Sequence, residues 1–295
     1  MSRVKVLSVL VAIGVLSVSL KAIQQPAAGA KPMVVEVQKI KDNLFMLTGG
    51  GGNTAVFVRS DGVTVVDTKN PGWGQPILAK IKELTNKPVT MIVNTHTHGD
   101  HVSGNVAFTG KVEVVTQANT RTNMEKMKVF GESKGVGLPT RVFGDYMSIG
   151  SGADRVELRY FGRGHTNGDA WVFFPALRVV HSGDIFAGKQ LPLIDANNGG
   201  SGFDLPRTLS RAHATLGDVE TIITGHSTLM TPADLKEYAE FNDDFLTAVR
   251  DGKAAGRTAE EIVNAWKMPE KYKGYGEPQP ARVKANVELI YNELR

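Results

Sequence analysis

The chain has 295 residues, 41% of them hydrophobic, which is enough to bury a core and excludes a disordered or fibrous protein. The absence of cysteine excludes disulfides, cysteine nucleophiles and thiolate ligands, so any metal must be held by His, Asp or Glu. The formal net charge of +4 falls to +1 when the first 30 residues, with three basic residues and no acid, are set aside. Because no basic block follows, we expect no nucleic-acid partner.

The N-terminus is typical of a secretory signal peptide. Arg3 and Lys5 precede an apolar run over 6–20, and Ala28-Gly29-Ala30 offers a cleavage site. This run is short for a membrane span, which needs about 20 residues. We therefore favour cleavage over an uncleaved anchor, and expect an exported protein, periplasmic or secreted, without stable membrane association. The predicted organisation is a signal peptide over 1–30 and one domain over 31–295.

Strands and helices alternate along the mature chain. Two β-hairpins are predicted, 34–40 with 44–48 and 54–59 with 63–67, each joined by residues with turn chemistry. Periodicity and turn residues predict strands over 89–93, 111–116, 155–161, 170–174, 178–181 and 221–224, helices over 75–84, 118–128, 205–216 and 283–294, and a loop over 129–140. Thr231 and Thr258 are predicted helix caps.

This order of elements indicates the fold class. Because hairpins interrupt the βαβ pattern, we expect an α/β protein with mixed sheets and not a purely parallel sheet. The segments 53–67 and 167–184 each contain a polar start, an apolar hairpin and a terminal Asp, which suggests two similar halves.

Three of the seven histidines fall in one hexapeptide, His96-Thr97-His98-Gly99-Asp100-His101. It follows the predicted strand 89–93, and ligands commonly bind at strand ends in α/β proteins. In an extended segment His96 and His98 share a face and can reach one ion, while Asp100 and His101 can reach a second. Packing offers no reason for such a cluster in a short loop. The hexapeptide therefore predicts a metal site, and imidazole with carboxylate suits zinc.

Three further candidate ligands each lie beside a glycine at a strand-to-loop junction: His165, Asp184 and His226. Two zinc ions need about six to eight protein ligands, and the candidates number seven with these three. We expect His181 and His213 to be structural, and the Gly49–Gly52 run to be a plain loop because it lacks the Lys-Ser/Thr ending of a phosphate cradle.

The H-x-H-x-D-H hexapeptide and the later Gly-His, Gly-Asp and Gly-His junctions resemble the metallo-β-lactamase superfamily, over about residues 34–226. The resemblance implies an αββα sandwich of two mixed sheets flanked by helices, with metals at one edge. It also implies a first zinc on His96, His98 and His165, a second on Asp100, His101 and His226, and Asp184 bridging the two ions.

Departures from the family pattern bear on the substrate. The chain cannot supply the Cys ligand of some secreted β-lactamases, and the group that uses only His and Asp usually lacks an Asp at position 184. A bridging Asp is more typical of glyoxalase II-like thioesterases, lactonases, phosphodiesterases and sulfatases. Flavodiiron relatives carry an acid at the position of His98, which disfavours a diiron redox centre.

We therefore expect an exported hydrolase that uses a dinuclear-zinc hydroxide to open a cyclic amide, as in a β-lactam, or a related ester bond of a small molecule. The alternatives are a lactonase or thioesterase on the same fold and, disfavoured because all seven ligand positions are filled, a non-catalytic zinc-binding protein. Asp100 is the predicted catalytic residue, which orients the hydroxide and carries a proton to the leaving group. The segments 129–140 and 196–203 are predicted walls of the substrate site. No pattern indicates the oligomeric state.

Overall fold

Twelve β-strands form two mixed sheets within residues 33–294, which the computed structural model describes. The predicted signal peptide over 1–30 lies outside the described residues. The first sheet contains, in spatial order, β1 (Glu36–Lys41), β2 (Leu44–Thr48), β3 (Thr54–Val58), β4 (Val63–Val66), β5 (Val89–Val93), β6 (Glu113–Gln117) and β7 (Arg141–Phe143). The second contains β12 (Thr221–Thr224), β11 (Val179–Gly183), β10 (Ala170–Phe174), β9 (Val156–Tyr160) and β8 (Tyr146–Ile149).

Each sheet joins antiparallel hairpins to parallel strands. In the first sheet the three pairings from β1 to β4 are antiparallel, and the three pairings from β4 to β7 are parallel. In the second sheet β8 to β11 are antiparallel, and β11 is parallel to β12. The predicted α/β class with mixed sheets is therefore confirmed. The hairpin β3–β4 followed by parallel β5 is repeated by β10–β11 followed by parallel β12, in agreement with the similarity between 53–67 and 167–184.

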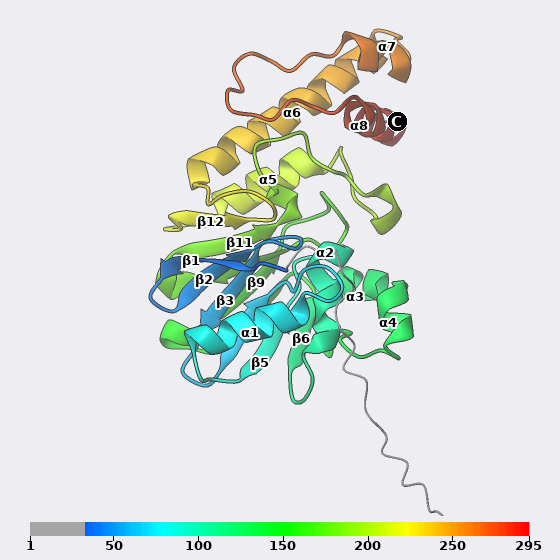
Figure 1. Ribbon diagram of the computed structural model, residues 1–295. Helices are drawn as coiled ribbons and strands as arrows, with labels where there is room; N and C mark the ends of the chain where they lie inside the picture. The colour runs from blue at the N-terminus through cyan, green and yellow to red at the C-terminus, as the bar shows by residue number, and fades with distance from the viewer. Residues whose placement is uncertain (1–32, 295) are drawn as a thin grey trace, which may run out of the picture. The chain divides into compact units, whose positions relative to one another are not determined.

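Helices cover the outer faces of both sheets (Figure 1). Helix α1 (Gly74–Leu84) buries Ile77 and Ile81 in a core on the first sheet. Helices α5 (Leu205–Ala214), α6 (Pro232–Ala254) and α8 (Pro280–Glu293) share a core with the second sheet. A further core fills the space between the sheets. Four layers result, which confirms the predicted αββα sandwich.

Strands that are buried on both faces supply the cores on either side of them. In β10, Trp171 and Phe173 belong to the core beneath the helices, whereas Val172 and Phe174 belong to the core between the sheets. This alternation follows from the two-residue period of a strand. A continuous apolar run is the sequence pattern of such a strand, so β10 is readily predicted.

The structure differs from the predicted elements between residues 118 and 149. The helix predicted over 118–128 ends earlier, as α3 (Ala118–Met124), and α4 (Lys128–Glu132) lies mainly in the segment predicted as a loop. Phe130 of α4 is buried with Val102 and Met124, so tertiary packing stabilises a helix too short to show a period. The sequence does not predict β7 and β8, because both are short and expose several side chains.

The predicted helix starts agree with the structure. Thr231 begins α6 in a capping box with Asp234, and Thr258 begins α7 (Ala259–Ala265) in a capping box with Glu261. Within residues 33–294, no helix is both long enough and apolar enough to cross a membrane.

Candidate metal centre

The seven candidate ligands all follow the carboxyl ends of strands. They lie after β5 and in α2 (Gly99–Val102), after β9, after β11 and after β12: His96, His98, Asp100, His101, His165, Asp184 and His226. Hydrogen bonds join the two sheets at this edge. The Asn53 side-chain amide donates to the Thr224 carbonyl at 2.9 Å, and the Ala170 N–H donates to the Thr95 carbonyl at 2.8 Å. The sandwich therefore gathers ligands from both sheets at one place.

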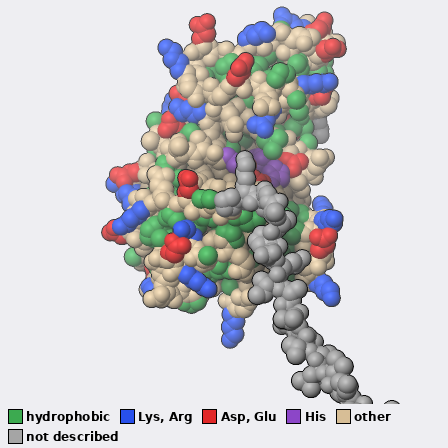
Figure 2. Space-filling model, in the orientation of Figure 1, with side chains coloured by type: hydrophobic (Ala, Val, Ile, Leu, Met, Phe, Trp, Pro, Cys, Tyr) green, Lys and Arg blue, Asp and Glu red, His purple; other side chains and the backbone are tan. Residues whose placement is uncertain are grey.

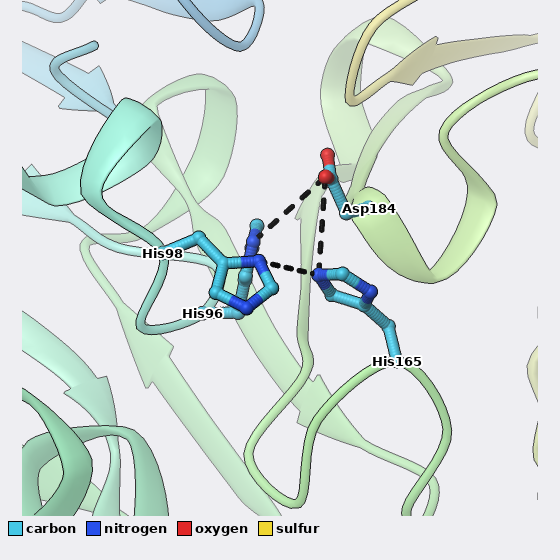
Figure 3. Close-up of side chains that lie close together, drawn as sticks. All are labelled: His96, His98, His165 and Asp184. Carbon is cyan, nitrogen blue, oxygen red and sulfur yellow. Dashed lines mark hydrogen bonds and ion pairs between the residues drawn. The ribbon is translucent and has the colours of Figure 1, made fainter. Parts of the chain in front are cut away.

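His96, His98, His165 and Asp184 form the first group, shown in Figure 3. Their candidate ligand atoms all lie within 4.8 Å of one another. His98 Nδ1 is 2.9 Å from His165 Nε2. Asp184 Oδ2 is 4.0 Å from His96 Nε2 and 3.8 Å from His165 Nε2. Three imidazoles and one carboxylate thus surround a common point.

Asp100, His101 and His226 form the second group. The Nε2 atoms of the two histidines are 3.2 Å apart, and Asp100 Oδ2 is 3.1 Å from His226 Nε2. Asp184 reaches this group as well, because its Oδ1 is 3.2 Å from His101 Nε2 and its Oδ2 is 3.2 Å from His226 Nε2. The structure therefore brings all seven predicted residues together, with Asp184 common to both groups.

The second group is the more open side of the centre. Asp100 and His226 are 31% and 34% exposed, whereas His101 is fully buried. Histidine side chains are visible at the surface in a hollow of the molecule (Figure 2). Beside His226 lies a groove of about 540 Å³, lined by the β1–β2 hairpin together with Ser227 and Thr228. A small molecule can approach the second group along this groove.

The donor atoms fit metal ions. His96 Nε2 is buried without a hydrogen-bond partner among the described residues, and Asp184 Oδ1 forms no hydrogen bond of proper geometry. A buried polar atom without a hydrogen bond destabilises the folded protein by about 1–3 kcal/mol. Zinc–nitrogen bonds of about 2.0–2.1 Å place neighbouring tetrahedral ligands about 3.3 Å apart. The nitrogen–nitrogen separations of 2.9 Å and 3.2 Å in the two groups are close to this value.

Asp67, which follows β4, supports the histidines from the interior. Its Oδ2 accepts hydrogen bonds from His101 Nδ1 and Thr95 Oγ1, each at 2.7 Å, and its Oδ1 accepts one from the Thr95 N–H at 2.8 Å. Thr95 Oγ1 is also 2.9 Å from His96 Nδ1. Although Asp67 lies near enough to His96 and His101 to be a ligand, its oxygens are already engaged. We therefore assign it a supporting role, which leaves Nε2 of both histidines for a metal.

The segment 191–195 supports the other two histidines of the first group. The Leu193 carbonyl accepts a hydrogen bond from His165 Nδ1 at 2.7 Å, and Asp195 Oδ2 accepts one from His98 Nε2 at 2.7 Å. His165 Nε2 and His98 Nδ1 are thereby left for a metal. The sequence analysis missed both supporting acids, Asp67 and Asp195. Asp67 is the terminal Asp of the segment 53–67 and stands at the end of a buried strand, but the sequence assigned it no role, and nothing marks Asp195.

The glycine run 49–52, predicted to be a plain loop, forms a wall of the second group. The Gly52 N–H donates to the Asp100 carbonyl at 3.0 Å, and a Cβ at Gly52 would lie 2.1 Å from His101 Cε1. The fully buried Lys69 holds this loop, donating to the Gly52 carbonyl at 2.7 Å and to a second carbonyl. Close approach to the His101 ring therefore requires glycine at position 52.

The electrostatics at His96 and His165 favour neutral imidazoles. Burial lowers the pKa of His96 well below its usual range, and it lowers the pKa of His165 to about 4. Both rings are therefore uncharged at neutral pH, which is the form in which histidine binds a metal.

The second group carries an excess of acidic charge. Burial lowers the pKa of His101, but the carboxylates of Asp184 and Asp67 outweigh burial and raise it well above its usual range. Hydrogen bonds to Asp100 and Asp184 raise the pKa of His226 to about 9. Protons on the His101 and His226 rings compensate the negative charge of these carboxylates in the absence of a bound cation. The arrangement therefore favours positive charge at this position, and a divalent cation would supply it.

The other histidines and loops agree with the predictions where the structure tests them. His181 Nε2 is 3.1 Å from the Asn53 carbonyl oxygen, and its Nδ1 accepts a hydrogen bond from the Gly183 N–H, so its role is structural. His213 lies on α5 and belongs to neither group. Segment 196–203 directly follows the supporting Asp195. That 129–140 and 196–203 are walls of a substrate site stays a prediction.

Comparison with known proteins identifies the family. Residues 47–226 match the model of the metallo-beta-lactamase superfamily, and the matched range contains all seven candidate ligands. The chain belongs to this superfamily of metal-dependent hydrolases, as the motif predicted.

Individual relatives differ in activity. The chain is 30% identical to a hydroxyacylglutathione hydrolase of Nostoc punctiforme over 162 residues, which are 54% of this chain and about half (53%) of that protein. It is 26% identical to metallo-beta-lactamase IND-1 of Chryseobacterium indologenes over 217 residues, 68% of this chain and 84% of the relative.

Solved structures share the fold. A metallo-beta-lactamase from Pontibacter korlensis superposes with a TM-score of 0.61 at 20% identity, covering 71% of this chain and 99% of the other. The sec-alkylsulfatase Pisa1 from a Pseudomonas species superposes with a TM-score of 0.73 at 14% identity, covering 88% of this chain and 50% of the other.

Proposed function

We propose that the chain is an exported hydrolase with two zinc ions, which opens a cyclic amide of the β-lactam type or a related ester bond in a small molecule. The observation that carries this proposal is the position of Asp184. Its carboxylate lies 3.2 Å from the histidine nitrogens of the second group and 3.8–4.0 Å from Nε2 of His165 and His96 in the first. A carboxylate shared in this way supports two ions side by side, and His and Asp are ligands that zinc accepts.

The ligand set divides between the two ions. His96, His98 and His165 would hold the first ion, Asp100, His101 and His226 the second, and Asp184 both. Zinc ions bound here would lower the pKa of water to about 7 and would polarise the carbonyl of a substrate. The first group keeps its geometry through Thr95, Leu193 and Asp195, while His226 of the second group lines the groove.

Asp100 is the residue placed to handle protons. Burial raises its pKa, but the hydrogen bond with His226 and the charge of His101 outweigh burial and lower the pKa below its usual value. Asp100 is therefore ionised at neutral pH and is 31% exposed on the open side. It can accept a proton from water and deliver it to the leaving atom of the substrate. Asp184, 9% exposed, is too enclosed for that role.

Thioesters and lactones are the second candidate substrates. Asp184 favours them, because an acid at this position is more typical of the esterase and thioesterase members that the sequence resembles. The 30% identity to a hydroxyacylglutathione hydrolase points the same way. The identity to a β-lactamase extends over more of the chain and supports the cyclic amide.

The test is metal content together with turnover. The chain from Lys31 onward, loaded with zinc, should contain two ions and hydrolyse a β-lactam, lactone or thioester in a substrate panel that also includes a phosphodiester. Asp184→Ala should lose the second ion and the activity. One ion at saturating zinc would contradict the dinuclear centre, and two ions without any turnover would show a zinc-binding protein instead of an enzyme.

Export is tested separately. Mass spectrometry of the protein outside the cytoplasm should find an N-terminus near Lys31. A product that retains Met1 inside the cell would overturn the proposed location.

A further inference from the structure

The C-terminal helix α8 contacts the segment that supports the first metal group. Segment 191–195 supplies the Leu193 carbonyl to His165 and the Asp195 carboxylate to His98. The backbone N–H of Asp195 also donates to the His165 carbonyl at 2.8 Å. Two of the three histidines in the first group therefore take their orientation from five consecutive residues.

Helix α8 holds the start of this segment by two adjacent carbonyls. The Asn286 side-chain amide donates to the Pro192 carbonyl at 2.8 Å, and Arg282 donates to the Leu191 carbonyl at 3.3 Å. These carbonyls immediately precede Leu193, whose own carbonyl receives the His165 hydrogen bond. A shift of the Pro192 peptide therefore moves the acceptor of His165 directly.

The same helix also packs on the chain just beyond the segment. Glu293 accepts a hydrogen bond from the Phe203 N–H at 2.9 Å. A Cβ at Gly202 would lie 2.4 Å from Ile290 Cγ1, so the backbone there lies directly on the helix. The supporting segment is thus held by α8 at its start and shortly after its end.

Asn286 stands on the apolar face of α8. It is 2% exposed and lies between Val283, Val287 and Ile290, which are buried in the core. A buried amide is unfavourable unless its polar atoms are hydrogen-bonded, so packing alone would favour an apolar residue at this position. The bond to the Pro192 carbonyl accounts for an asparagine here. Helix α8 lies outside residues 47–226, the range that matches the superfamily.

We propose that Asn286 is a positioning residue of the metal centre: through the Pro192 carbonyl it fixes segment 191–195, and through that segment the His165 and His98 rings. The inference rests on the proposed zinc centre, but it concerns affinity for the first ion and not the reaction. Supporting residues directly behind a ligand typically change metal affinity by about 10–100-fold. Asn286 acts one residue further away from the ligand, so we expect its loss to weaken the affinity for the first ion by about tenfold.

The experiment compares two buried asparagines. Asn286→Leu removes the bond to the Pro192 carbonyl. Asn242→Leu is the matched control, because Asn242 on α6 is 4% exposed and donates at 2.8 Å to Tyr238, one turn earlier in the same helix. Zinc dissociation constants for both ions are measured by chelator competition, the first site is followed by the absorption spectrum of bound Co²⁺, and thermal unfolding is recorded on the metal-free proteins.

Asn286→Leu should weaken the first ion about tenfold and change its Co²⁺ spectrum, with the second ion less affected. Asn242→Leu should lower the unfolding temperature but leave both constants unchanged. First-ion affinity within twofold of wild type in Asn286→Leu, or an equal loss in Asn242→Leu, would overturn the proposal. If Asn286→Leu does not fold, Arg282→Met, which removes the neighbouring bond from a half-buried side chain, carries the same comparison. A wild-type protein that takes up no zinc would overturn the proposed function as well.

Discussion

Replacing Asp67 by Asn should weaken the second metal ion selectively. Asp67 accepts hydrogen bonds from His101 Nδ1, from Thr95 Oγ1 and from the Thr95 N–H. An amide in its place keeps one acceptor oxygen but presents an NH₂ group where the second oxygen was. If the oxygen stays on the Thr95 N–H, the NH₂ group faces His101 Nδ1. The His101 proton then moves to Nε2, the atom directed at the metal.

The magnitude follows from the bond that is lost. A hydrogen bond to a charged partner contributes about 1.5–3 kcal/mol, and 1.4 kcal/mol corresponds to a factor of ten in an equilibrium constant. We therefore expect the dissociation constant of the second ion to rise about 10–100-fold, which is also the range for outer residues of metal sites. Asp67 has a φ of 61°, and Asn tolerates this left-handed backbone as well as Asp does, so strain is not introduced.

Zinc titration against a competing chelator measures both constants, and thermal unfolding of the metal-free variant checks the fold. Asp195→Asn provides the mirror experiment, because Asp195 supports His98 and should weaken the first ion instead. If Asp67→Asn leaves both constants within threefold of wild type, the supporting role assigned to Asp67 is wrong. Equal weakening of both ions by either variant would show that the two supports do not act on separate sites.

Three other substitutions test the remaining assignments. Asp100→Asn should lower kcat/KM by at least about 10²–10⁴-fold while the first ion stays bound, because an amide cannot pass on the proton; near-normal turnover would refute this role. Gly52→Ala should displace the His101 ring and weaken the second ion, as zinc titration will show. Gly144→Ala should not, because no atom of residues 33–294 other than its chain neighbours lies within 4 Å of a Cβ at that position. Thr231→Ala should lower the free energy of unfolding by about 1 kcal/mol through loss of the α6 cap, without a change in metal content; an unchanged denaturant midpoint would contradict it.

The local part of the metal centre could be predicted from the sequence. His96 to His101 stand in one hexapeptide, and the two-residue spacing of an extended chain already places two rings on one side. His165, Asp184 and His226 could be added because each stands beside a glycine at a strand end. The structure brings these three to the hexapeptide, although the residues themselves are far apart along the chain.

The supporting residues could not be predicted, because each acts across the fold. Asp195 lies 97 positions from His98, and Asp67 lies 34 positions before His101. Neither belongs to a motif, and only the packing of the sheets brings them to the rings. Gly52 could not be singled out either. In the sequence it is one of four consecutive glycines, and only the structure places it against the His101 ring.

The secondary-structure elements that the sequence fails to predict are short or buried on one side only. Strand β10 is buried and apolar throughout, and β5 is apolar except for Thr90, so both are predicted correctly. Strands β7 and β8 pair at sheet edges and expose several residues, so their pattern does not differ from that of a loop. Helix α4 has five residues, too few to show a helical period.

The ligands of each group come from both sheets of the sandwich, and this has a consequence for a chain without cysteine. His96 and Asp100 follow a strand of the first sheet, whereas His165, Asp184 and His226 follow strands of the second. A metal ion held by both sets is a cross-link between distant parts of the polypeptide. Extracellular proteins commonly obtain such a cross-link from a disulfide, which restricts the unfolded chain more as the loop it closes grows longer. If the proposed centre binds metal and the chain is exported as proposed, coordination would close the stretch from Asp100 to His226. Resistance to unfolding would then depend on the supply of metal and not on oxidising conditions.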